Sequence, residues 1–156
     1  MSKPDFETTY TVLMIFMLFG CSAVRSEDAA GIRSTFLSSC PESPNCVSTE
    51  AQEIRHKIEV FRLKGDFSKN WIEIQRALAT LPRSTIEKAD ETYLHATFKS
   101  RMFRFIDDLE LSLNPSSGII SIRSAAQTGY WDFGVNRRRV KHLRHELLSR
   151  DLILPP

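Results

Sequence analysis

The sequence lacks an apolar run long enough to cross a membrane comfortably. Its main hydrophobic stretch, YTVLMIFMLFG at residues 10–20, has 11 residues, whereas a transmembrane helix needs about 20. The sequence also lacks an excess of charge of either sign, because 21 Lys and Arg face 19 Asp and Glu. A formal charge of +2 does not predict nucleic acid as a partner. With 42% hydrophobic and 26% charged residues, the 156-residue chain has the composition of one globular domain, which excludes a disordered tail, a collagen-like fibre and a polytopic membrane protein.

The stretch at residues 10–20 fits the hydrophobic core of a signal peptide, with Lys3 before it and Cys21 after it. The residues LFGC that end at Cys21 resemble a bacterial lipobox, in which cleavage before the cysteine and acylation of its thiol, for example with palmitate, anchor the mature protein. We therefore expect residues 1–20 to be a signal peptide and Cys21 to be lipidated. The protein would then lie in the cell envelope, at the outer membrane or the periplasmic face of the inner membrane. A buried helix or an uncleaved anchor is the alternative.

Cysteine is scarce, and its count of three is odd. Acylation of Cys21 would leave Cys40 and Cys46, which bracket a five-residue segment with two prolines that favours a turn. A disulfide closing this loop would stabilise the fold by about 2 kcal/mol, and a reduced pair is the alternative. Two cysteines without a second pair make an incomplete tetrahedral site, so we expect no zinc, and no motif calls for a cofactor.

Residues 21–39 are rich in serine and alanine, which is typical of a flexible tether, and residues 40–156 are expected to form a single domain. Apolar residues at alternating positions predict strands at residues 58–63, 84–89, 93–101, 104–113 and 119–126. A stripe at spacings of four and three predicts a helix from Phe67 that ends before Pro82, and a second helix is expected to start from a cap at Asn136. The order β-α-β-β-β-β-α predicts an α+β fold: one antiparallel sheet of about five strands, with both helices on one face.

The hairpin at residues 108–124 restricts its own register. Leu111 must lie opposite Ile120 or Ile122 to keep the apolar residues on one face, so Arg123 must face Asp108 or Glu110. We expect these carboxylates to belong to a structural network of charges.

Asp107 lies on the same side of its strand as Leu109 and Leu111, so its side chain should point toward the core. There it needs a partner such as Arg101 or an arginine of the last helix. The side chain of Asp108 should point to the other face. The two aspartates face opposite ways, which argues against a catalytic pair of carboxylates.

The segment TGYWDFGVNRRR at residues 128–139 places three arginines at the start of a helix, where they oppose the helix dipole. Helix amides with guanidinium groups could hold an anion, and the aromatic residues could add a stacking surface. In the alternative, the aromatics plug the end of the sheet while the arginines pair with carboxylates. The candidate anion or ligand site comprises Arg101, Arg123, Tyr130, Asp132, Asn136 and Arg137.

No catalytic motif is complete. His142 and His145 are three apart on a helix but do not form HExxH, and there is no nucleophile elbow, dinucleotide-binding turn or P-loop. His95 lies on the polar side of its strand without a placed nucleophile, so we assign it no catalytic role.

Several blocks in order over about residues 40–148 resemble domain of unknown function family 1499. They are Cys40-Pro41, Ser43–Ser48, Tyr93–Ala96, Ser100-Arg101, Phe105–Glu110, Ile122–Ser124, Gly129-Tyr130 and Asp132–Arg137. Many members of the family look exported or lipid-anchored. No reaction is established for the family, so the resemblance implies no catalytic residue.

These features together predict an envelope lipoprotein with a membrane anchor and a non-enzymatic domain that binds a small anionic ligand, an envelope polymer or a protein partner. The alternative is an enzyme acting on an envelope lipid or glycan, with Asp107, Asp108 or Glu110 as acid and base.

Overall fold

Residues 37–156 are described by the computed structural model. The predicted signal peptide, Cys21 and most of the predicted tether lie outside the described residues. The described elements are β1 (Cys46–Ser48), β2 (Phe61–Arg62), α2 (Phe67–Ala79), β3 (Ser84–Ala89), β4 (Tyr93–Lys99), β5 (Ile106–Asn114), β6 (Ile119–Ala126) and α3 (Val135–Ser149).

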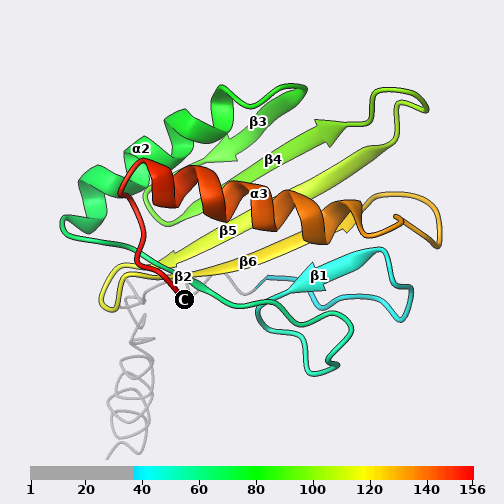
Figure 1. Ribbon diagram of the computed structural model, residues 1–156, viewed down its shortest axis with the longest axis horizontal. Coiled ribbons are helices and arrows are strands. Elements are labelled where there is room, and N and C mark those ends of the chain that lie inside the picture. The colour runs from blue at the N-terminus through cyan, green and yellow to red at the C-terminus, as the bar shows by residue number, and fades with distance from the viewer. Residues whose placement is uncertain (1–36) are drawn as a thin grey trace, which may run out of the picture. The chain divides into compact units, whose positions relative to one another are not determined.

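The strands form one antiparallel sheet in the order β1-β6-β5-β4-β3, and β2 also pairs with β6. Both helices lie across the same face of the sheet (Figure 1). This arrangement confirms the predicted α+β class and the single antiparallel sheet. The structure adds β1, which has only three residues, all buried, and therefore no alternation by which the sequence could reveal it. The first predicted strand is reduced to two residues.

The long hairpin of β5 and β6 has one of the two registers that the sequence allowed. Leu111 faces Ile122 and Glu110 faces Arg123, with both apolar side chains fully buried. Successive residues of a strand point to opposite faces, so the leucines and isoleucines meet the helices while Glu110 and Arg123 lie on the other face. The turn of this hairpin carries Gly118 in the left-handed region at φ 66°, where any Cβ would meet the ring of Phe67 at 2.4 Å.

Helix α2 begins after Asp66, whose side chain accepts a hydrogen bond from the amide of Lys69 at 3.0 Å. Its predicted apolar stripe is confirmed, because Trp71, Ile74 and Leu78 are buried against the sheet.

Helix α3 buries Val140, Leu143 and Leu147 in the same core. Its start corrects the sequence analysis, because Asn136 is not the cap. Gly134 occupies that position in a left-handed conformation, and Asn136 lies fully buried inside the first turn. Within residues 37–156, no helix is long and apolar enough to span a membrane.

Candidate functional site

The sheet face opposite the helices carries a network of paired polar groups. Arg123 Nη1 donates to Glu110 Oε2 at 2.9 Å, and the Tyr93 hydroxyl donates to Glu110 Oε1 at 2.7 Å. The side chains of Arg123 and Glu110 are only 15% and 17% exposed. Burial, and next the hydrogen bond to Glu110, raise the pKa of Tyr93 well above the ordinary value of a phenol. Tyr93 therefore remains a neutral donor throughout the physiological pH range.

Asp108 lies on the same face and has its own partners. His95 Nε2 lies 2.8 Å from Asp108 Oδ1, which also accepts from Gln127 Nε2 at 3.0 Å. Asp107 points to the other face, so the two neighbouring aspartates do not form a pair of carboxylates. The geometry thus gives the enzymatic alternative no adjacent acid and base from Asp107 and Asp108.

Asp107 lies on the helix side of the sheet, where it is 6% exposed and paired with Arg139 of α3. Arg139 Nη2 lies 2.5 Å from Asp107 Oδ2, and Arg139 Nη1 donates to Ser124 Oγ and Asn136 Oδ1. The guanidinium also lies over the ring of Phe98, 4.8 Å from its centroid. Helix α3 therefore supplies the cationic partner that was expected for Asp107, because the side chain of Asp107 points toward the core.

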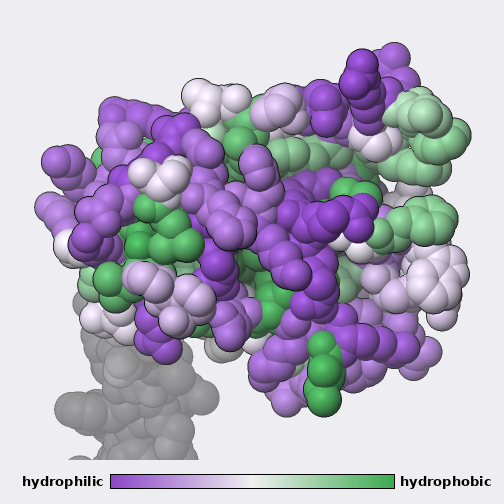
Figure 2. Space-filling view, in the orientation of Figure 1, coloured by the Kyte–Doolittle hydropathy of each residue, from purple (hydrophilic) through white to green (hydrophobic). Residues whose placement is uncertain are grey.

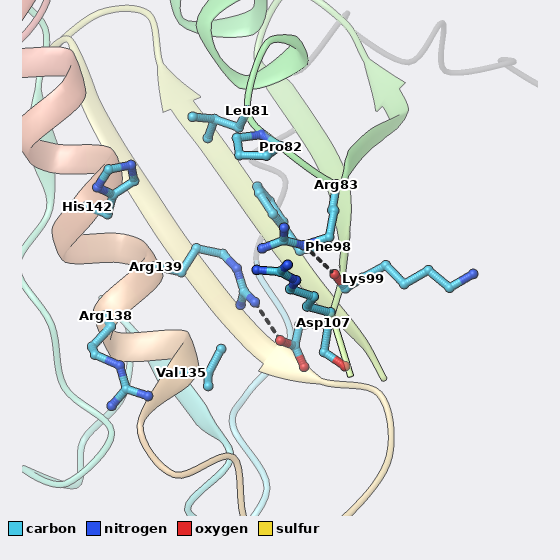
Figure 3. A pocket seen from close by; sticks show the side chains of 12 residues that line it. Leu81, Pro82, Arg83, Phe98, Lys99, Asp107, Val135, Arg138, Arg139 and His142 are labelled. Carbon is cyan, nitrogen blue, oxygen red and sulfur yellow. Dashed lines mark hydrogen bonds and ion pairs between the residues drawn. The ribbon is translucent and has the colours of Figure 1, made fainter. Parts of the chain in front are cut away.

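A groove of about 510 Å³ opens beside this ion pair, between α3, the end of β4 and the link from α2 to β3 (Figure 3). We call it the arginine groove. It is lined by Leu81, Pro82, Arg83, Phe98, Lys99, Ser100, Arg101, Asp107, Val135, Arg138, Arg139 and His142. Asp107 is the one carboxylate among these residues, and Arg139 already neutralises it.

The other arginines of the groove make no ion pair with any described residue. Arg83 Nε donates to the carbonyl of Lys99 at 3.2 Å, and Arg138 Nη1 donates to the carbonyl of Phe133 at 2.8 Å. A backbone carbonyl carries no net charge, so these guanidinium groups keep their positive charge uncompensated. Arg101 has no hydrogen bond from its side chain within residues 37–156. The groove therefore has a positive excess at one end of the sheet.

The structure does not bring the six predicted site residues together. Arg101 lines the arginine groove, whereas Arg123 lies on the opposite face of the sheet with Glu110. Asn136 is fully buried and donates to the carbonyl of Asn45 at 3.1 Å. These three residues thus have three different environments.

The remaining three are Tyr130 and Asp132, in the loop before α3, and Arg137, in its first turn. The carboxylate of Asp132 accepts from the amides of Gly134 and Asn136, both at 2.8 Å, so the helix amides proposed for an external anion are already occupied. Arg137 donates to two carbonyls, those of residues 55 and 57, and Tyr130 is 60% exposed. The aromatic residues of this segment do not plug the sheet.

Sequence reasoning missed Arg83 and His142 as lining residues. Arg83 follows Pro82 between two elements, so no periodicity assigns it to a face, and its φ of 62° lies in the left-handed region. His142 lies one turn beyond Arg138 on α3, and this spacing of four was the only available signal. Among the described residues, no three His, Cys, Asp or Glu side chains are grouped to hold a metal ion.

The predicted disulfide is confirmed: Cys40 and Cys46 are bonded, with their Cα atoms 5.6 Å apart. Beside it, His56 is 2% exposed and its Nδ1 lies 2.8 Å from the carbonyl oxygen of Cys46. A carbonyl only accepts, so Nδ1 is the donor of this hydrogen bond.

Fold and site together define an α+β domain that has one antiparallel sheet, two helices on one face and a basic groove at one end. The chain belongs to the family described as Protein of unknown function (DUF1499), whose model matches residues 36–147. The match spans β1 to most of α3 and includes all the residues that line the groove. A search of curated proteins found no match.

Proposed function

We propose that this protein is a lipid-anchored protein of the cell envelope whose domain binds an anionic ligand in the arginine groove without transforming it. The observation that carries the binding role is the charge balance of the groove, where four arginines face a single carboxylate. Guanidinium groups bind phosphate and carboxylate through paired hydrogen bonds, so a small ligand with such a group fits best.

The conformation of Arg83 supports this role. Its φ of 62° is uncommon for a residue with a Cβ and is retained although it costs stability. The backbone carbonyl of Arg83 accepts a hydrogen bond from the amide of Lys99 at 3.0 Å. This bond holds the backbone from which the Arg83 side chain extends at the wall of the groove. Strained residues of this kind are enriched at binding sites.

The envelope location is supported by the uncharged stretch at residues 10–20, by the motif that ends at Cys21 and by the disulfide. Disulfides persist in oxidising compartments such as the periplasm and are rare in the cytosol. A bonded Cys40 and Cys46 therefore agree with export.

The anchor predicts a specific mass for the native protein. Mass spectrometry of protein extracted from membranes should find residues 1–20 missing and acyl chains on Cys21. The Cys21→Ala variant should leave the membrane fraction, whereas Ser22→Ala should remain in it. Native protein that begins at an unmodified Met1 would contradict the anchor.

Anion binding predicts a change in thermal stability. The melting temperature of the full chain in a non-ionic detergent should rise with sodium phosphate, compared with sodium chloride at the same ionic strength. Binding to the folded state stabilises it by about 2.7 kcal/mol when the free ligand is at a hundred-fold excess over Kd. Arg83→Gln combined with Arg101→Gln should abolish this rise, because it removes two uncompensated charges from the groove.

The matched control is Arg76→Gln combined with Arg150→Gln, which changes the net charge equally at two exposed arginines outside the groove. This control should keep the response to phosphate. An equal loss in both double variants, or no response in the unaltered protein, would refute the proposed groove.

A further inference from the structure

Two exposed apolar loops lie next to each other at the end of the sheet where the arginine groove opens. The β4–β5 loop leads into Ile106, the first residue of β5. The carbonyl of Ile106 accepts from the amide of Gln127 at 3.0 Å, and Gln127 begins the β6–α3 loop. Both loops project from the same end of the domain (Figure 1), and hydrophobic surface gathers at that end (Figure 2). We call their six large apolar side chains the loop tip: Met102, Phe103, Phe105, Tyr130, Trp131 and Phe133.

The side chains of the loop tip are directed to solvent. Each of the six is between 54% and 85% exposed. The rings contact each other within each loop: Phe103 and Phe105 have centroids 5.8 Å apart, and Tyr130 and Trp131 have centroids 5.4 Å apart. Grouped exposed apolar side chains on a water-soluble fold mark an interaction surface.

The charges around the loop tip are positive. Lys99 ends β4, and Arg101 and Arg104 lie within the β4–β5 loop. The side chains of these three residues make no ion pair within residues 37–156. The β6–α3 loop contains one acid, Asp132, whose oxygens accept from the amides of Gly134 and Asn136. The surface thus combines aromatic rings with uncompensated bases and has no free carboxylate of its own.

We propose that the loop tip docks onto the surface of a bilayer that contains anionic phospholipid. Aromatic side chains partition into the interfacial region of a membrane, and nearby Lys and Arg add attraction to anionic headgroups. The charge complementarity favours this occupant over a neutral protein surface. The proposal deepens and rests on the proposed function, because it names the anion of the arginine groove as the phosphate of a membrane lipid. Arg101 belongs to both surfaces, so a headgroup could enter the groove while the rings enter the interface.

Trp131 provides a direct readout, because the chain has two tryptophans and the other, Trp71, is buried in the core. The full chain is incorporated into vesicles of phosphatidylcholine alone or of equal parts phosphatidylcholine and phosphatidylglycerol. The emission of Trp131 should shift to shorter wavelength, and brominated acyl chains should quench it, in the anionic vesicles only. Trp131→Phe should remove the change and so assign it.

Two variants test the sources of this attraction. Arg101→Gln with Arg104→Gln should shift the equilibrium between docked and undocked loops about 30-fold toward undocked, at about 1 kcal/mol for each base near an anionic surface. Phe103→Ser with Phe105→Ser should abolish the quenching of Trp131 but keep the phosphate effect on melting temperature. Ile54→Ser, which removes an exposed apolar side chain outside the loop tip, should change neither.

The outcomes separate the two proposals. If Trp131 in the membrane-bound protein is not quenched but the protein still responds to phosphate, the docking of the loop tip is overturned and the arginine groove stands. This is the result expected if the loops bind another protein instead of a membrane. Quenching that depends on anionic lipid, without any response to phosphate, would overturn the arginine groove and the headgroup assigned to it.

Discussion

Replacing Arg139 with methionine is expected to lower the free energy of unfolding by about 3 kcal/mol, because it leaves a charged carboxylate buried without a partner. Asp107 is 6% exposed, and Arg139 is the one described side chain that forms an ion pair with it. The variant also deprives Ser124 and Asn136 of a hydrogen-bond donor. Chemical denaturation of the full chain in detergent, with circular dichroism as the probe, measures the loss.

The double variant Asp107→Leu with Arg139→Met should recover most of this loss. A buried ion pair replaced as a whole by apolar groups costs little, since no isolated charge remains. The matched control is Arg150→Met, which breaks an exposed pair with Glu146 and should cost about 0.5 kcal/mol or less. A loss no larger in Arg139→Met than in Arg150→Met would contradict the role assigned to the buried pair.

Replacing Asn136 with leucine is expected to cost about 3 kcal/mol, although the two side chains have the same number and branching of heavy atoms. Asn136 is fully buried, and its side chain joins three parts of the chain through Asn45, Ser124 and Asp132. Leucine makes none of these bonds, so the carbonyl of Asn45 and the hydroxyl of Ser124 would each lose a partner. The same denaturation experiment measures the effect.

Asn70 supplies the comparison for this prediction. It is a half-buried asparagine on α2 whose side chain donates to the carbonyl of Lys64 in a hydrogen bond that is open to solvent. Water can replace a hydrogen bond at an exposed site, so Asn70→Leu should cost about 1 kcal/mol or less. Similar losses in the two variants would show that Asn136 does not connect these segments in the way described.

The sheet was predictable because alternation is a local property. Once Leu111 had to face an isoleucine, Arg123 had to face a carboxylate, and the structure selects Glu110 from the two possibilities. The parity of Asp107 likewise required a buried cation, and the structure supplies Arg139. The same parity could have excluded Arg123 from a site near α3, because Arg123 and Ile122 point to opposite faces of the sheet.

The arginine groove was not predictable from patterns. Arg83, Arg101 and Arg138 come from three segments that meet only after the helices have packed on the sheet. The arginines of α3 gave a signal as a run of like charge, but the sequence could not show which of them finds a carboxylate. In the structure Arg139 does so, while Arg137 and Arg138 donate to backbone carbonyls.

By itself, the sequence determined the antiparallel sheet, the two amphipathic helices, the limit of two registers for the β5–β6 hairpin and the buried position of Asp107. These follow from the repeats of strands and helices and from the cost of burying an unpaired charge, and neither requires knowledge of distant neighbours. Only the tertiary structure decided which basic residues share the groove, that Asn136 is a buried connector, and that the aromatic loops face solvent. Those properties depend on contacts between residues far apart in the chain, which no local repeat encodes.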